Sequence, residues 1–342
     1  MIDIYELLRR NQDRTSNYVR ATLEEMGVAY DMDKYGNIYY LDNENVPLLS
    51  AHMDTVRKEE DLCIGAFLNE SEDDKIFSGG ILGGDDKCGV YIILKVLETG
   101  RKVNFIFSRD EEIGCLGIKA LLKPNYSENK ELTDKVRNCL YCLVLDRKHN
   151  NDIVCEQNDY GTEEFEKALE KISNEGNFGY RGARGLCSDA NTIRDYISTA
   201  NLSVGYFEPH SQKEYISKKD LQNALDYTIA IIDNLKEQFK AAEVKTYNYY
   251  SNRYYNSYYD FPGYFDDDFD GYDYSDWSWQ DWKNYDLKGK KGTKCSFCEI
   301  NSTKEPLYEM ILPNGEAKMI CEFCLEDLEN EIKRIRLLIN KV

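Results

Sequence analysis

The stretch Val46-Pro-Leu-Leu-Ser-Ala-His-Met-Asp-Thr-Val56 places a histidine and an aspartate directly after a short apolar run. Its apolar residues predict a buried β-strand that ends at His52. The chain has only three histidines among its 342 residues, and a second one, His210, ends the similar stretch Leu202-Ser-Val-Gly-Tyr-Phe-Glu-Pro-His210. Two of the three histidines therefore follow predicted strands, where α/β proteins place their active sites.

Three acidic motifs lie between these two histidines: Gly83-Gly-Asp-Asp-Lys87, Asp110-Glu-Glu-Ile-Gly114 and Leu143-Val-Leu-Asp146. Each motif stands at the end of a predicted strand or in the turn after it. Because aspartate and glutamate are rarely buried without a partner, packing in a core explains this pattern poorly. Imidazoles and carboxylates gathered at one edge of a sheet predict a hydrolytic site with two metal ions.

The spacing of these residues suggests individual roles. His52 is expected to be a terminal ligand of one ion. Asp54 lies two residues further on, so it points to the same side and can orient the His52 ring. Either Asp85 or Asp86 must bridge the ions, because a dinuclear site needs a shared carboxylate.

The remaining acidic residues complete the predicted site. Glu111 and Glu112 are adjacent in the sequence, so they cannot face the same way on an extended backbone. We expect one of them to bind metal and the other to act as the general base. Asp146 and His210 supply the remaining ligands.

Residues 1–243 alternate between helical and strand patterns. The helices are expected at residues 4–26, 89–97, 117–122, 163–172, 189–196 and 218–239, and the strands at 36–40, 48–51, 103–107, 140–145 and 202–206. This alternation predicts an α/β fold, a three-layer sandwich with a mostly parallel central sheet.

Residues 244–287 differ sharply in composition. Eleven tyrosines, all three tryptophans and the run Asp266-Asp-Asp-Phe-Asp-Gly271 fall between Tyr247 and Asp286. Aromatic and acidic residues without aliphatic ones do not build a core, so this segment is predicted to be a disordered, low-complexity linker. A second interpretation is a segment that binds a partner or self-associates through its aromatic residues.

Residues 288–342 contain two Cys-x-x-Cys pairs. Four thiolates at this spacing predict one structural Zn²⁺ site, which substitutes for the core that so short a segment lacks; its ligands are Cys295, Cys298, Cys321 and Cys324. The segment resembles the treble-clef zinc finger of the ClpX unfoldase, which dimerises and docks proteins. Ten Lys/Arg nearly balance nine Asp/Glu from Leu287 onward, which favours docking of a protein partner or self-association over nucleic-acid binding.

The composition narrows the function classes further. A net charge of −19 argues against a general nucleic-acid binder, and no apolar run is long enough to span a membrane. The eleven cysteines come without a secretory signal, so we expect metal-bound or buried thiols in a reducing compartment. These features predict an acidic, soluble, cytoplasmic protein.

Five motifs together resemble the M20 family of zinc peptidases, and its tripeptidase T branch in particular. In chain order they are Ala51-His-Met-Asp-Thr55, Gly84-Asp-Asp-Lys87, Asp110-Glu-Glu-Ile-Gly114, Ser188-Asp-Ala-Asn191 and Pro209-His-Ser-Gln-Lys-Glu-Tyr215. The resemblance runs from about residue 45 to residue 217 and includes every ligand position.

The resemblance implies a role for each site residue and a cis peptide bond between Asp85 and Asp86. One zinc ion would be held by His52, Asp85 and Asp146, and the other by Asp85, Glu112 and His210. Glu111 would be the general base and Asp54 would support His52. The substrate-side loop would contain Ser188, Asp189 and Asn191.

One departure from that family concerns its lid. M20 enzymes usually insert a domain between the third acidic ligand and the last histidine, but only 63 residues separate Asp146 from His210 here. We therefore expect a catalytic core without the lid domain, closer in layout to M28 aminopeptidases. The lid supplies an oxyanion-stabilising histidine in that family, and the candidates for this role here are Tyr160, Arg181 and Arg184.

The sequence thus predicts a metallopeptidase that hydrolyses peptide bonds with a water activated between two Zn²⁺ ions, or Co²⁺ or Mn²⁺. An amidohydrolase that acts on N-acylated small molecules would use the same ligands. A non-enzymatic adaptor on a hydrolase fold is the third possibility. Retention of both Glu111 and Glu112 argues against the adaptor.

Overall fold

The computed structural model describes residues 2–56, 69–70, 74–78, 80–124, 128–242, 307–311 and 317–321. The chain divides into two compact units, Met1–Tyr249 and Tyr250–Val342.

The first unit is built on an eight-stranded sheet with the order β1-β2-β6-β3-β7-β10-β8-β9. The four strands at its centre, β6, β3, β7 and β10, run parallel to one another. Their carboxyl ends therefore meet at one edge of the sheet. The strands are β1 (Asp31–Met32), β2 (Ile38–Tyr40), β3 (Leu48–His52), β6 (Asn104–Ser108), β7 (Cys142–Arg147), β8 (Asp152–Val154), β9 (Arg181–Ala183) and β10 (Thr199–Ser203).

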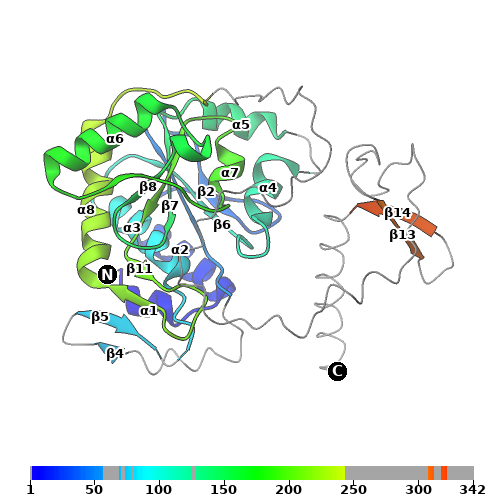
Figure 1. The fold of residues 1–342 in the computed structure, drawn as a ribbon, viewed down its shortest axis with the longest axis horizontal. Helices are drawn as coiled ribbons and strands as arrows, with labels where there is room; N and C mark the ends of the chain where they lie inside the picture. Colours follow the sequence, from blue (N-terminus) through cyan, green and yellow to red (C-terminus); the bar gives the residue numbers. More distant parts are fainter. Residues whose placement is uncertain are drawn as a thin grey trace, which may run out of the picture. The chain divides into compact units, whose positions relative to one another are not determined.

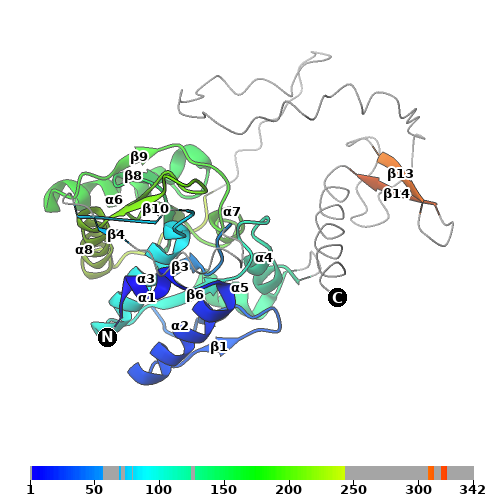
Figure 2. The ribbon, with the colours of Figure 1, turned by 90° about the horizontal axis from the view of Figure 1, so that it is seen from below.

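Helices cover both faces of this sheet (Figures 1 and 2). The helices α1 (Ile4–Leu8), α2 (Gln12–Met26), α3 (Gly84–Glu98), α6 (Glu163–Gly176) and α8 (Lys218–Asn234) share one core with the sheet. The opposite core contains α4 (Leu116–Leu122), α5 (Lys130–Arg137) and α7 (Ala190–Ile193). The predicted three-layer α/β fold is confirmed. No helix in the described ranges is long and apolar enough to cross a bilayer.

Alternation along the strands explains how one sheet supports two cores. In β7, Leu143 and Leu145 pack into the core of α3, whereas Cys142 and Val144 pack into the core of α4. Successive side chains of a strand point to opposite faces, so a strand covered on both sides is apolar throughout. This is why the central strands are continuous apolar runs in the sequence.

The predicted strand at residues 202–206 is wrong in one respect. β10 ends at Ser203, and Tyr206–Phe207 form a separate strand, β11, of another sheet. Gly205 makes the break, with a φ of 87° and with its Cα so close to α8 that a Cβ would lie 2.5 Å from the Leu221 nitrogen. This second sheet has the order β11-β12-β5-β4 and includes β12 (Tyr215–Ser217), β5 (Lys75–Phe77) and β4 (Asn69–Glu70).

Two predicted helices are longer in the sequence pattern than in the structure. α7 ends at Ile193 and not at residue 196, and α8 ends at Asn234 and not at residue 239. After α8 the chain is extended from Leu235, and the Phe239 N–H donates to the Leu140 carbonyl. The apolar residues after Asn234 therefore pack against the sheet without being helical.

In the second unit the structure describes a hairpin of β13 (Leu307–Ile311) and β14 (Ala317–Cys321), paired antiparallel. Cys321 ends β14 and is paired in register with Leu307. The other three predicted zinc ligands, Cys295, Cys298 and Cys324, lie outside the described residues, as does the linker of residues 244–287.

Candidate metal centre

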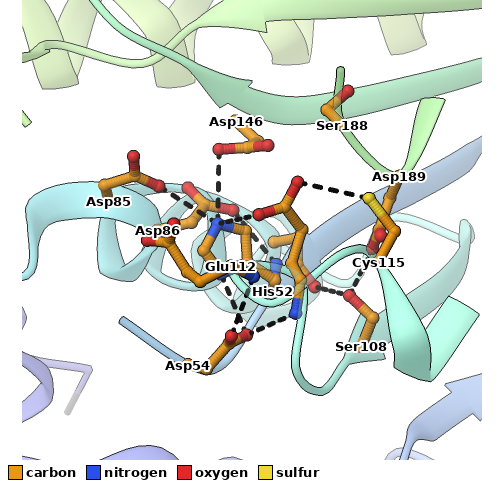
Figure 3. A network of polar contacts seen from close by, with 12 residues as sticks. His52, Asp54, Asp85, Asp86, Ser108, Glu112, Cys115, Asp146, Ser188 and Asp189 are labelled. Atoms are coloured by element: carbon orange, nitrogen blue, oxygen red, sulfur yellow. Dashed lines mark hydrogen bonds and ion pairs between the residues drawn. The ribbon is translucent and has the colours of Figure 1, made fainter. Parts of the chain in front are cut away.

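The carboxyl edge of the central strands carries the predicted ligands. β3 ends at His52, the turn after β6 contains Glu111 and Glu112, and Asp146 lies near the end of β7. Asp85 lies at the start of α3, which packs against β3 and β7. Figure 3 shows Asp54, Asp85 and Asp146 grouped around His52, with the network of polar contacts that joins them.

The imidazole of His52 is buried, and carboxylates lie close to both of its nitrogens. Nε2 is 3.0 Å from Oδ1 of Asp85 and 3.4 Å from Oδ1 of Asp146. Nδ1 is 3.2 Å from Oδ1 of Asp54. Nε2 is thus directed at two carboxylate acceptors, while Asp54 fixes the orientation of the ring from the Nδ1 side.

Asp85 connects the two histidines. Its Oδ1 lies 3.0 Å from Nε2 of His52, and its Oδ2 lies 3.3 Å from Nε2 of His210. Nε2 of His210 is also 3.1 Å from the carboxylate of Glu112. A carboxylate with one oxygen directed at each of two ligand sets has the arrangement that a bridging ligand requires.

Asp54 also shapes the turn after β6. Its two oxygens accept hydrogen bonds from the backbone N–H groups of Glu111 at 3.1 Å and Glu112 at 3.0 Å. The same carboxylate therefore holds the His52 ring and both glutamates. These contacts lower the pKa of Asp54 to about 2, against the opposing effect of burial, because His52 and the two backbone donors favour its charged form.

The carboxylates at this edge repel one another. Burial raises the pKa of Asp146 to about 7, and the neighbouring charge of Asp85 adds to the effect. Burial also raises the pKa of Glu111 to about 9, together with the charges of Asp146 and Asp189. His210 responds in the opposite sense, because hydrogen bonds to Asp85 and Glu112 raise its pKa to about 10. So many buried acids at one place favour a bound cation.

The imidazole and carboxylate groups at this edge of the sheet are suited to bind a metal ion. One oxygen or nitrogen each from His52, Asp85 and Glu112 lies within 4.8 Å of the others, and His52, Asp86 and Asp146 form a second such group. Imidazole nitrogen and carboxylate oxygen are ligands that Zn²⁺ accepts in catalytic sites. These residues could therefore hold a metal ion.

The sequence from residue 48 to residue 234, which is more than half of the chain, matches the model of peptidase family M20/M25/M40. The chain belongs to this family. It is therefore a hydrolase of the metallopeptidase class. No match to a curated protein was found.

Solved structures support the fold of this M20-family chain. Aminopeptidase PepT from Bacillus cereus is 17% identical, with a TM-score of 0.51, and the alignment covers 67% of this chain and 96% of that one. A tripeptidase from Staphylococcus aureus is 14% identical, with a TM-score of 0.51 and coverages of 67% and 95%. A TET aminopeptidase from a Thaumarchaeota archaeon is 11% identical, with a TM-score of 0.52 and coverages of 67% and 95%. At these identities the similarity concerns the fold.

Asp86, the other candidate for the bridge in this M20-family chain, has different contacts. Its carboxylate is buried and accepts hydrogen bonds from the backbone N–H groups of His52 and Gly89. It therefore ties α3 to the end of β3, and of the two neighbours Asp85 is the one that faces both histidines. The peptide bond between Asp85 and Asp86 is cis, as the family resemblance implies.

The predicted substrate-side loop lies beside this centre. Ser188 and Asp189 are buried, and Asp189 accepts a hydrogen bond from Oγ of Ser108 at the end of β6. Asn191 accepts hydrogen bonds through Oδ1 from the Ser188 N–H and from the Tyr160 hydroxyl. These contacts fix the shape of the loop.

The candidates for oxyanion stabilisation differ in their surroundings. The buried hydroxyl of Tyr160 lies 2.6 Å from Asn191 Oδ1 and 3.0 Å from the Leu186 carbonyl, so it belongs to the scaffold of the loop. Arg181 is exposed on β9. The carbonyl of Arg184 accepts a hydrogen bond from Arg147.

Three buried residues that the sequence patterns do not single out support the ligands. Glu214 accepts hydrogen bonds from the Gly83 and Asp85 N–H groups and so holds the start of α3. The Tyr206 hydroxyl lies 3.3 Å from Oδ1 of Asp146, and Nζ of Lys87 donates to the Met53 carbonyl at 2.5 Å. Glu214 and Lys87 both lie in motifs described above. What the sequence does not reveal is that their side chains are buried.

Proposed function

We propose that the first unit hydrolyses peptide bonds with two metal ions held by five ligands: His52, Asp85, Glu112, Asp146 and His210. The observation that carries this proposal is the position of Asp85, whose two oxygens face the two histidines. In this assignment His52 and Asp146 serve one ion, Glu112 and His210 serve the other, and Asp85 serves both. The ions would be Zn²⁺, or Co²⁺ or Mn²⁺.

When bound, the ions lower the pKa of water toward neutrality and polarise the scissile carbonyl. Glu111 is the residue placed to move protons, because its Oε2 lies 3.8 Å from Nε2 of His52, at the edge of the ligand group. It accepts a proton from the attacking water and returns it to the leaving amine. Asp54 keeps Glu111 in place through its backbone N–H.

Replacement of Glu111 by glutamine tests this assignment. General acid–base catalysis contributes roughly 10²- to 10⁴-fold, so Glu111→Gln should lower kcat by about that factor while the metal content is unchanged. Asp110→Asn is the matched control, because Asp110 bonds Gln12 and Tyr35 and not the ligand group. Near-wild-type turnover in Glu111→Gln would refute the assignment of the base.

The same proposal includes the absence of a lid domain. The residues between Asp146 and His210 supply β8, α6, β9, α7, β10 and β11, all of which belong to the two sheets or their helical cover. This use of the segment supports a catalytic core without the inserted domain that family members usually carry. The Ser188, Asp189 and Asn191 loop then forms the substrate side of the site.

For the second unit we propose a zinc finger that holds one structural Zn²⁺ through four thiolates: Cys295, Cys298, Cys321 and Cys324. Its role would be docking of a protein partner or self-association, at the end of a linker of residues 244–287. The cysteine-rich composition supports a reducing, cytoplasmic compartment.

A further inference from the structure

Two thiols and two carboxylates meet beside the proposed metal centre. Single ligand atoms of Glu111, Cys115 and Asp189 lie within 4.8 Å of one another. Cys187 lies close enough to Cys115 for the two thiols to shift each other's pKa in opposite directions. Figure 3 shows Cys115 next to Asp189 and Ser108. The four residues come from only two places in the chain, the turn after β6 and the loop before α7.

Asp189 is an incompletely satisfied buried carboxylate. The residue is only 2% exposed. Oδ2 accepts a hydrogen bond from Ser108, whereas Oδ1 has no hydrogen-bond partner in the described part of the chain. A buried acceptor without a partner destabilises the fold, so such a group indicates a ligand at this position.

The distance between Cys115 and Glu111 fits the coordination shell of a tetrahedral ion. With Zn–S of about 2.3 Å and Zn–O of about 2.1 Å, a tetrahedral shell separates sulfur and oxygen by about 3.6 Å. Sγ of Cys115 lies 3.5 Å from Oε1 of Glu111. The Cys187 thiol and an oxygen of Asp189 would supply the third and fourth donors. A set of two thiols and two carboxylates suits Zn²⁺ and its thiophilic analogue Cd²⁺.

We propose that Cys115, Cys187, Asp189 and Glu111 form a further site for a thiophilic divalent cation, separate from the two-metal centre. Cys187 is exposed and the other thiol is buried, so the ion enters from the Cys187 side. Binding displaces the thiol protons to solvent, and no oxidation or reduction takes place.

This site shares Glu111 with the catalytic centre, and here the inference rests on the proposed function. Oε1 of Glu111 faces Cys115 at 3.5 Å, while Oε2 faces His52 at 3.8 Å. An ion held by Oε1 and the thiols withdraws this carboxylate from proton transfer. Excess thiophilic metal therefore inhibits the enzyme through a binding site of its own.

The test is a Cd²⁺ titration of the full chain, already loaded with its tightly bound metal. A phosphine reductant is present throughout to keep the thiols reduced. Total metal per chain and the ultraviolet thiolate-to-cadmium absorbance are followed together with peptide hydrolysis. Wild-type protein should bind one more equivalent than the Cys115→Ser/Cys187→Ser variant and lose activity as that equivalent binds. The single variant Cys187→Ser, at an exposed position, should also lose the extra equivalent.

Cys155→Ala is the matched control, because Cys155 is a buried thiol that packs in the other core of the sheet from Cys115, and it should bind as wild type does. Equal Cd²⁺ uptake in wild type and both serine variants would overturn the site. The site would also be overturned if the cysteine variants changed activity only when reductant is omitted and with no extra ion bound, because that result would indicate a disulfide. If the extra ion binds but no form of the protein hydrolyses peptides, the proposed function fails and the metal site stands.

Discussion

At the scale of single residues, Asp54 is the residue on which the geometry of the site depends most. One carboxylate orients the His52 ring and holds the backbone of both glutamates in the turn after β6. The sequence predicts the first of these roles from the two-residue spacing. It cannot predict the second, because the turn lies 57 residues away in the chain.

Asp54→Ala should therefore weaken the site without removing a ligand. Loss of an outer-shell partner typically lowers metal affinity or activity by about 10- to 100-fold, and a similar loss is expected here. Competition with a chelator of known affinity measures it. Asp54→Asn keeps one acceptor oxygen and should fall between wild type and the alanine variant; an alanine variant with unchanged affinity would contradict the role of Asp54.

Cys187 provides a prediction of pH dependence. The hydrogen bond from the Cys115 thiol stabilises the Cys187 thiolate, and with nearby Lys119 it lowers the pKa of Cys187 to about 6 against the effect of burial. Because a lowered thiol pKa means that the reactive thiolate is present above that pH, alkylation of Cys187 should rise through about pH 6 and be complete near neutrality. The pKa of Cys115 is raised instead, so it should stay unreactive.

Brief iodoacetamide treatment at a series of pH values, followed by peptide mapping with mass spectrometry, measures the alkylation of both cysteines in one experiment. In Cys115→Ala the alkylation midpoint of Cys187 should move to higher pH, because the variant has no side-chain donor for the Cys187 thiolate. A Cys187 that titrates near pH 9 in wild type would contradict the contact between the two thiols.

At the scale of elements, the close approach of α3 to β7 brings the ligands together. A Cβ at Gly89 would lie 2.1 Å from the Leu145 carbonyl oxygen and 2.6 Å from the Asp86 carboxylate. The sequence pattern predicts a helix here, but the apolar stripe does not reveal that its first turns touch the strand backbone. Glycine is required at this position because no side chain fits between the two elements.

Gly89→Ala should therefore force α3 away from the sheet. Overpacking against backbone costs about 3 kcal/mol or more at its upper range, and we expect that decrease in the free energy of unfolding. Gly100→Ala, just past the other end of α3, is the control: Gly100 has a φ of 77° but open space around its Cα. That change should cost only about 1 kcal/mol. Equal urea-unfolding midpoints for the two variants would contradict the close packing.

The second sheet shows where sequence patterns fail at this scale. Residues 202–206 are apolar enough for one continuous strand, yet the chain turns at Gly205 and begins β11 in another sheet. The cause is tertiary, since Gly205 lies against the backbone of α8. His210 consequently reaches the site from the four-stranded sheet and not from the end of a central strand.

At the scale of the whole molecule, the order of the motifs was enough to predict the three-layer fold. Continuous apolar runs such as the one ending at His52 indicated strands buried on both faces, and the helical stripes between them indicated crossovers. The strand order and the short strands β4, β5, β8 and β9 could not be predicted, because two- or three-residue strands have no periodicity of their own. The same limit applies to Glu214, which acts through backbone atoms far away in the chain.

A dinuclear centre at this edge of the sheet requires that His52 and His210 both hold metal. The most direct measurement is the metal content per chain, by mass spectrometry, of wild-type protein and of the His52→Ala/His210→Ala variant, both purified without chelator or added metal. We expect two fewer ions per chain in the variant, with the metal of the proposed finger retained in both. Equal metal content in the two proteins would contradict a dinuclear centre at this edge of the sheet.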